Sequence, residues 1–198
     1  VFGLLNVTRA VLPPMRAQRS GRVINISSIG GYQAYMGWGV YGSTKFAVEG
    51  LTEALHAELA PLGIKVTVVE PGYFRTEFLE GNSLVESPST IADYDSTAGE
   101  VRRIAKSVSM NQPGDPDKLA QVMITLVQAP NAPLRLPLGS DCVAAIEALN
   151  LLTANQHPQQ AQRYTRDEAG MSRLVADFYS YAQAPDGGPG VPLGSHVN

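Results

Sequence analysis

The sequence predicts an α/β fold, a doubly wound parallel sheet, and three observations support this prediction. Residues 22–28 and 64–69 are apolar and rich in β-branched side chains, which is typical of strands buried inside a parallel sheet. An amphipathic segment at 41–60 lies between them and has the spacing of a helix. Strand, helix and strand joined by short connections form a βαβ unit, whose two strands pair in parallel.

Composition limits the classes of function. The 198 residues are 44% hydrophobic and 17% charged, which fits a globular domain with a sizeable core. Fifteen basic and 18 acidic side chains give a net charge of -3, so we expect no nucleic-acid-binding surface. No apolar run approaches the roughly 18 residues of a membrane span and no signal peptide opens the chain, so we expect no membrane contact and a cytoplasmic location. The single Cys142 excludes an internal disulfide and is typical of a core residue.

The first half of the chain alternates between helices and strands. Apolar residues at helical spacing predict a helix over residues 1–19. Since this helix begins without a capping residue, we expect further chain to precede it. The first strand leads into a loop of small and aromatic residues at 29–40, which the helix at 41–60 follows. Pro71-Gly72 ends the second strand.

The second half contains a long insertion and then further regular elements. Residues 77–112 are polar and weakly periodic apart from a helical patch at 101–108, which is typical of a lid or binding segment. Asp115 and Pro116 form an N-cap pair for the next helix, and Pro137 places a short strand at a sheet edge. The other predicted segments are that strand at 134–138, a helix from Ser140 or Asp141 to Ala154, and a helical region at 159–181. We expect one domain over residues 1–182 and a flexible tail over residues 183–198.

Tyr41 and Lys45 are the candidate acid–base pair. They are four residues apart at the start of a helix, so both side chains lie on one helix face with Cβ atoms about 5–6 Å apart. An ammonium group beside a phenol is expected to lower the phenol's pKa toward the working pH, as acid–base chemistry requires. Of the eight tyrosines, only Tyr41 has a lysine four residues later. The pair also follows a strand end, where parallel sheets bind ligands.

These motifs together resemble the second half of a short-chain dehydrogenase/reductase. The segments that resemble the family are Asn25-Ile26-Ser27-Ser28, Tyr41-Gly42-Ser43-Thr44-Lys45 at a step of 13 residues from Ser28, and Glu70-Pro71-Gly72 followed by Thr76. The resemblance covers residues 1–80 closely and the rest more loosely, as the variable substrate-binding part. It implies a Rossmann-like sheet, NAD(P) as cofactor, and a homo-oligomer.

The resemblance also implies a role for each matching residue. Tyr41 would be the general acid in reduction and the base in oxidation, Lys45 would lower its pKa and bind the nicotinamide ribose, and Ser28 would orient the substrate oxygen. Ser27 would face the other side of the strand. Further residues that would bind the cofactor are Pro71, Gly72, Phe74 and Thr76. The residues that would line a substrate pocket are Tyr35 and Trp38, together with Tyr32 and Met36. Weaker candidates for this pocket are Phe78, Leu79 and Leu84.

Two features of the family are absent from the sequence. The glycine-rich turn that receives the pyrophosphate and an Asn-Asn-Ala-Gly segment have no counterpart, since Gly30-Gly31 and Gly187-Gly188 do not lie between a strand and a helix. The family's catalytic asparagine would directly precede Val1, and Asn6 does not replace it. We therefore expect the chain to be the C-terminal part of a domain, without the N-terminal strands that hold the dinucleotide.

The leading hypothesis is an NAD(P)-dependent oxidoreductase that interconverts a secondary alcohol and a carbonyl compound, with a small, apolar substrate and no metal. One alternative is a non-catalytic remnant that serves as a dimerisation or scaffold protein through the apolar faces of the first two helices. Another is an epimerase or dehydratase, although the spacing from Pro71-Gly72 to Thr76 favours the dehydrogenase branch. NADH and NADPH both stay open, because the residues that select between them would lie upstream.

Overall fold

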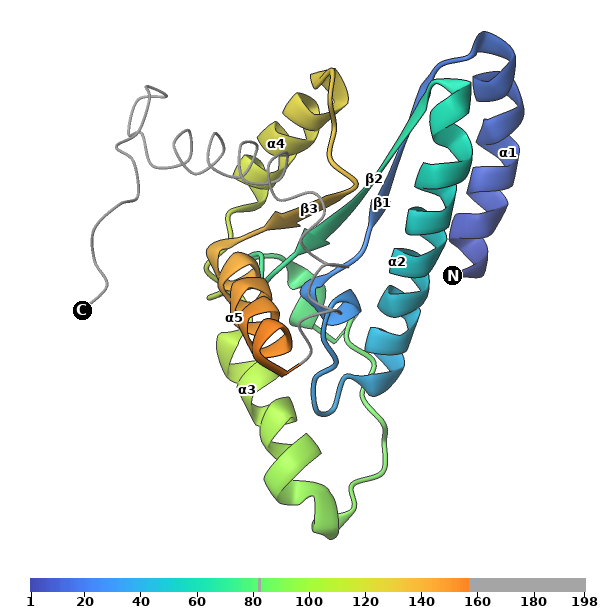
Figure 1. The fold of residues 1–198 in the computed structure, drawn as a ribbon. Coiled ribbons are helices and arrows are strands. Elements are labelled where there is room, and N and C mark those ends of the chain that lie inside the picture. The colour runs from blue at the N-terminus through green and yellow to red at the C-terminus, as the bar shows by residue number, and fades with distance from the viewer. Residues whose placement is uncertain (82, 157–198) are drawn as a thin grey trace, which may run out of the picture.

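Three parallel strands form the sheet around which the chain is organised (Figure 1). The computed structural model describes residues 1–81 and 83–156. Along the sheet the order is β1 (Gly21–Ile26), β2 (Ile64–Pro71) and β3 (Arg135–Leu138), and both strand pairs are parallel. This confirms the predicted parallel sheet, with the strand that contains Pro137 at its edge.

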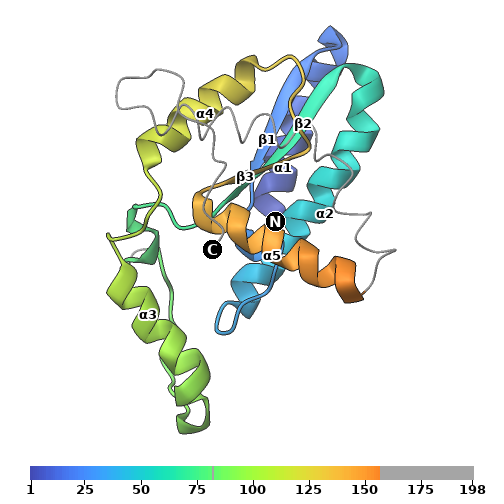
Figure 2. The same ribbon diagram turned by 60° about the vertical axis from the view of Figure 1, so that its left-hand side comes forward.

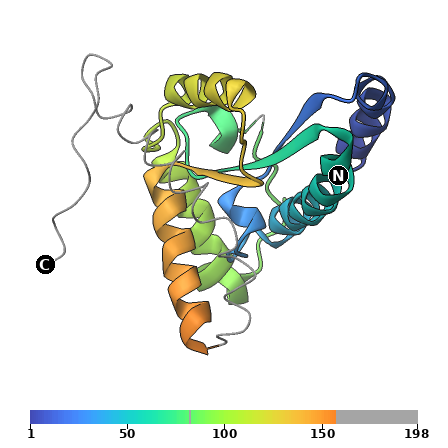
Figure 3. The same ribbon diagram turned by 45° about the horizontal axis from the view of Figure 1, so that its top comes forward.

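Helices cover both faces of the sheet. They are α1 (Phe2–Gln18), α2 (Gly39–Leu59), α3 (Glu100–Val108), α4 (Pro116–Gln128) and α5 (Ser140–Gln156). Figure 3 shows α4 on one side of the sheet, with α2 and α5 on the other. The arrangement is therefore doubly wound, as the sequence predicts.

Each face of the sheet has its own apolar cluster, because successive strand side chains point to opposite faces. Val69 faces α4, whereas its neighbours in β2 at positions 64 and 66 face α1 and α2. The cluster under α4 contains Val69, Val122, Leu126, Leu136 and Leu138, and the cluster under α1 and α2 contains Val23, Leu59, Ile64 and Val66. These two layers fix the sheet and bring the carboxyl ends of β1 and β2 side by side.

Local sequence explains where the elements begin and end. Asp115 accepts a hydrogen bond from the backbone N–H of Asp117 at 2.9 Å and caps α4, as predicted. Gly63 ends the short 3-10 helix η2 (Ala60–Leu62) that follows α2, and its φ of 74° is a left-handed conformation that glycine adopts without a steric penalty. β1 ends at Ile26, two residues earlier than predicted, because Ser28 caps a short 3-10 helix, η1 (Ile29–Gly31).

The insertion between β2 and α4 forms an arm that contains α3 beyond the carboxyl ends of the strands (Figures 1 and 2). It also contains η3 (Glu77–Leu79), η4 (Ala92–Tyr94) and η5 (Asp95–Gly99). The arm is closed at its base, where Phe74 bridges to Gly114, and the Arg75 N–H donates to the Gly114 carbonyl oxygen at 2.8 Å. The predicted helical region at 159–181 and the tail at 183–198 lie outside the described residues.

Candidate active site

A cavity of about 260 Å³ lies at the carboxyl ends of β1 and β2. Its walls come from four places: the two strand ends, η1, the first turns of α2, and the start of the arm. The predicted site residues that line it are Ser28, Tyr35, Trp38, Tyr41, Lys45, Pro71, Gly72, Phe74 and Thr76. The structure thus brings together the residues that the sequence analysis assigned to chemistry and cofactor, and Phe78 and Leu79 also line this cavity. The further substrate-pocket candidates Tyr32, Met36 and Leu84 do not line it, and the Tyr32 hydroxyl group instead donates to Asn150 Oδ1 at 2.7 Å.

Ser28 and Tyr41 meet because two glycines allow η1 to approach α2 closely. A Cβ atom on Gly30 would lie 3.2 Å from the Tyr41 ring, and one on Gly42 would lie 3.3 Å from the Gly30 carbonyl oxygen. The Ser28 hydroxyl accepts a hydrogen bond from the Gly30 N–H at 3.1 Å, which fixes its position. It also hydrogen-bonds the Tyr41 side chain. The two hydroxyl groups therefore form one unit at the cavity wall.

Lys45 does not lower the pKa of Tyr41 here, contrary to the sequence-based expectation. Burial raises the pKa of Tyr41, with a small opposing effect from the Ser28 hydrogen bond. The Lys45 Nζ lies 5.5 Å from the centre of the Tyr41 ring and donates to the Ile26 carbonyl oxygen at 3.1 Å. The ammonium group thus faces the ring and the end of β1 rather than the phenol oxygen.

Lys45 is itself half-buried, and its charge depends on a neighbour. Desolvation lowers the pKa of Lys45, because burial disfavours the charged form. Glu49, one helical turn further along α2, opposes this effect and raises the pKa of Lys45. A carboxylate outside the cavity lining therefore helps to keep a cavity-lining ammonium group charged.

Three aromatic rings form the apolar wall beside Tyr41. The Trp38 and Tyr41 rings meet edge to face with centroids 5.6 Å apart, and the Trp38 and Phe78 rings stack at 6.4 Å. Phe78 also contacts Tyr41, with centroids 5.7 Å apart. Phe78, a weaker candidate from sequence, thus lines the cavity, and it connects the arm to Tyr41.

The segment after β2 is held from two directions. The Gly72 N–H donates to the Leu138 carbonyl oxygen at 2.8 Å, and the Tyr73 N–H donates to Asp141 Oδ2 at 2.7 Å. A Cβ atom on Gly72 would lie 2.4 Å from the Asp141 carboxylate, so only glycine fits this approach. Thr76 caps η3 by accepting from the Phe78 N–H at 3.4 Å. The predicted cofactor-facing segment is therefore firmly positioned.

A second cavity of about 400 Å³ adjoins the first beneath α3. The two share Tyr35, Trp38, Tyr73 and Gln112, so together they form one extended space. The apolar side of the amphipathic α3 supplies Val101, Ile104, Ala105 and Val108 to this second cavity, and Met36 also lines it. The sequence identified the arm as a binding segment, but only the fold places this apolar face against Tyr35 and Trp38.

Sequence reasoning missed Asp141 and Gln112 as residues of the site. Asp141 holds the Tyr73 backbone, and Gln112 is 2% exposed and donates to the Thr76 carbonyl oxygen at 3.3 Å. Each is separated from its partner by more than 30 positions in the chain, so no local spacing could have found them. Cys142, in contrast, is a buried core residue as predicted, and its Sγ donates to the Glu70 carbonyl oxygen.

The described residues offer neither a metal-binding cluster nor a helix that could span a membrane. Over residues 1–81 and 83–156, no cluster of three or more His, Cys, Asp or Glu side chains could bind a metal ion. No helix in the same part of the chain has the length and apolar character needed to cross a membrane.

Comparisons with known proteins identify the family of the chain. Residues 1–86 match the family described as short chain dehydrogenase. A short-chain dehydrogenase structure from Streptomyces avermitilis superposes with a TM-score of 0.66 and 38% identity over 87% of this chain and 59% of that one. The chain belongs to the short-chain dehydrogenase family. Its relatives are oxidoreductases, and its sheet is the Rossmann-like sheet of that family.

Two further matches bear on chemistry. The 3-ketodihydrosphingosine reductase of Bacteroides thetaiotaomicron is 39% identical over 70% of this chain and 51% of its own length. A structure of ElxO with NADP bound is 28% identical, with a TM-score of 0.53 over 73% of this chain and 55% of that one. The chain spans about half the length of the curated short-chain dehydrogenase relatives that it matches.

Proposed function

We propose that the protein is an NAD(P)-dependent oxidoreductase that interconverts a secondary alcohol and a carbonyl compound. The observation that supports this function best is the meeting of Ser28, Tyr41 and Lys45 at one cavity beyond the strand ends. Two hydroxyl groups and an ammonium group there can orient a substrate oxygen and exchange a proton with it. An epimerase or dehydratase stays the weaker hypothesis, because the family relatives are oxidoreductases.

The cavity residues fit the nicotinamide end of the cofactor. The hydroxyl groups of Tyr41 and Thr76 and the Lys45 ammonium group are the donors that a ribose and a carboxamide require, and Pro71 and Phe74 offer apolar surface for a ring. When bound, a nicotinamide cofactor supplies or accepts the hydride. NADH and NADPH are both compatible with these residues. The bound NADP in ElxO supports a nicotinamide dinucleotide of this kind.

The protein's own residues would handle the substrate oxygen and its proton. Ser28 would hold the oxygen by a hydrogen bond from its hydroxyl group, whose position the Gly30 N–H fixes. Tyr41 would donate its phenolic proton to that oxygen during reduction and take it back during oxidation. Trp38 and Phe78 pack around the Tyr41 ring and would keep water away from this exchange.

The substrate that this site would accept is apolar and extended. Its reacting carbon would lie beside Tyr41, and its apolar part would enter the space beneath α3, between Trp38 and Val101. Apolar surface buried there contributes about 25 cal/mol per Å² to binding. The reductase relative acts on 3-ketodihydrosphingosine, according to its name, which supports a search among long-chain ketones.

The raised pKa of Tyr41 predicts how the reaction rates depend on pH. Because burial raises its pKa, Tyr41 is protonated near neutral pH and is ready to donate in reduction. We expect the rate of carbonyl reduction to be constant from about pH 6 to pH 9, and the rate of alcohol oxidation to rise about tenfold per pH unit, since oxidation needs the phenolate. Steady-state rates in both directions test this. An oxidation rate that levels off near neutral pH would contradict it.

Exposed apolar residues on the first two helices support the alternative hypothesis, a non-catalytic remnant that serves as a dimerisation or scaffold protein. Phe2 and Val7 on α1 are 82% and 63% exposed, and Val40 and Phe46 on α2 are 86% and 46% exposed. Titration with NADPH and NADH, followed by nicotinamide fluorescence, separates the hypotheses. The proposed enzyme binds one or both with a fluorescence change that Lys45→Met weakens. Binding of neither, also by a form that carries the N-terminal strands of the family, would favour the scaffold.

A further inference from the structure

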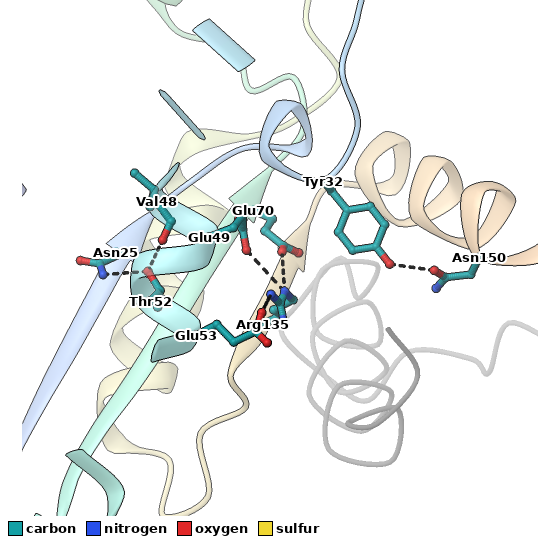
Figure 4. A network of polar contacts seen from close by, with 9 residues as sticks. All are labelled: Asn25, Tyr32, Val48, Glu49, Thr52, Glu53, Glu70, Arg135 and Asn150. Atoms are coloured by element: carbon teal, nitrogen blue, oxygen red, sulfur yellow. Dashed lines mark hydrogen bonds and ion pairs between the residues drawn. The ribbon is translucent and has the colours of Figure 1, made fainter. Parts of the chain in front are cut away.

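Four charged side chains meet in a cluster outside the cavity lining (Figure 4). Glu49 and Glu53 come from α2, Glu70 from β2, and Arg135 from β3. Glu49 and Glu70 are 7% and 1% exposed, whereas Glu53 lies at the surface. The cluster thus has two buried carboxyl groups and one guanidinium group.

One guanidinium group does not balance both buried carboxylates. The Arg135 Nε lies 3.4 Å from Glu49 Oε2 and 3.6 Å from Glu70 Oε1, which are ion-pair distances rather than good hydrogen bonds. Its Nη2 donates to Glu53 at 2.9 Å instead. Both oxygens of Glu49 and both of Glu70 are buried without a hydrogen bond from the described residues. Such groups are costly to bury unless one carboxyl carries a proton and donates it to the other.

The position of that proton follows from burial and from the neighbours. Desolvation raises the pKa of both carboxyl groups, and it raises the pKa of Glu70 well above the ordinary range. The charge of Glu49 raises the pKa of Glu70 further, whereas Ser27 and Arg135 oppose the rise at Glu49, which places the proton on Glu70. The other titratable or charged groups that interact with the pair are Lys45 from α2, Arg135 from β3 and Cys142 from α5. Glu53 of α2 reaches the pair only through Arg135, and Asp141 of α5 only through Cys142.

The pair is connected to the proposed active site at three points. Glu49 is one helical turn from Lys45 on the same face of α2 and supports its positive charge. Glu70 directly precedes the Pro71-Gly72 segment. Ser27, whose buried hydroxyl group lies beside Glu49, directly precedes Ser28. The cluster therefore adjoins three of the segments that line the site.

We propose that Glu49 and Glu70 form a carboxyl pair that shares one proton, held on Glu70, and that the Glu49 carboxylate is a positioning residue for Lys45. Glu49 would keep the Lys45 ammonium group charged while its Nζ stays bound to the Ile26 carbonyl oxygen beside Tyr41. This last role rests on the proposed function, whereas the shared proton does not. Glu53, which also pairs with Arg135 but lies at the surface, has no part in either role and is the matched control.

The shared proton is tested by carboxyl-carbon NMR of the ¹³C-labelled protein over a pH series. We expect one glutamate to titrate well above the ordinary range in the unmodified protein and in Glu53→Gln. That signal should be lost in Glu70→Gln, whose amide N–H replaces the proton as donor to Glu49. If no glutamate titrates above the ordinary range, or if Glu53→Gln removes the signal, the pair does not share a proton.

Stability gives an independent measurement of the same proton. A carboxyl group whose pKa is raised by folding adds stability that is present below its unfolded pKa of about 4.3 and is lost as pH rises through the folded value. Urea unfolding of the unmodified protein should therefore show a loss of stability with rising pH that Glu70→Gln does not share. Parallel pH curves for the two proteins would overturn the proposal.

The positioning role is tested by Glu49→Gln. We expect the Lys45 side-chain NMR signal to titrate at lower pH than in the unmodified protein. We also expect turnover to fall about tenfold at alkaline pH, with KM little changed. This loss is smaller than the roughly 10²–10⁴-fold that positioned acid–base groups contribute as a whole. Glu53→Gln should change neither. An unshifted Lys45 titration would refute the positioning role. Absence of turnover in every variant, with Lys45 shifted, would instead count against the proposed function alone.

Discussion

Replacement of Tyr41 by phenylalanine should abolish nearly all turnover while the protein stays folded. The change removes only the hydroxyl group that would exchange a proton with the substrate oxygen, and such acid–base groups contribute about 10²–10⁴-fold to rate. The ring contacts with Trp38 and Phe78 persist, since they need no hydroxyl group. Loss of the Ser28 hydrogen bond should cost only about 0.5–1.5 kcal/mol of stability.

Initial rates of reduction and urea unfolding measure these two effects separately. Tyr94→Phe is the matched control, because Tyr94 lies in the arm with 59% of its surface exposed and lines neither cavity. It should leave both the rate and the stability unchanged. If Tyr41→Phe kept a tenth or more of the original rate, Tyr41 would not be the acid–base residue.

Gly31→Ala should weaken both stability and turnover. A Cβ atom at this buried position would lie 2.4 Å from Ser27 Oγ and 3.1 Å from the backbone of Lys45, so η1 must move away from α2. Overpacking of this kind costs about 1–3 kcal/mol. The movement would separate Ser28 from Tyr41, and a displacement of about 1 Å in a catalytic group can reduce turnover about 10²-fold.

Gly50→Ala is the control for Gly31→Ala, because it makes the same change on the exposed face of α2. No atom lies within 4 Å of a Cβ placed there, and alanine in a helix interior is about 0.5–1 kcal/mol more stable than glycine. Urea unfolding should therefore shift in opposite directions for the two variants. A Gly31→Ala protein with unchanged stability and turnover would mean that the close approach of η1 to α2 is unimportant.

Much of the fold and the site could be predicted from local pattern. The apolar strands and the helix between them determine the βαβ unit, and the strand ends determine where a ligand binds. Tyr41 and Lys45 could be found because helical spacing places them on one face. Most of the predicted cofactor and substrate residues line the same cavity, because they lie in the loops that follow a strand end or at the start of the next helix.

Features that depend on distant residues could not be predicted. Glu49 is an ordinary surface-type residue in the sequence, and only the fold buries it against Glu70 and Arg135. The raised pKa of Tyr41 was also missed, because spacing places Lys45 nearby but does not show that its ammonium group binds the Ile26 carbonyl oxygen. Burial and hydrogen-bond geometry are tertiary properties, which no short motif encodes.

The central claim is that the protein transfers hydride between a nicotinamide cofactor and an apolar carbonyl compound. Its most direct test is incubation of the protein with reduced cofactor deuterated at the nicotinamide C4 position, as NADH and as NADPH, and with a panel of long-chain and cyclic ketones. Mass spectrometry should find one deuterium on the carbinol carbon of at least one alcohol product, and Tyr41→Phe should remove it. No deuterated alcohol from any ketone, although the cofactor binds, would contradict the account.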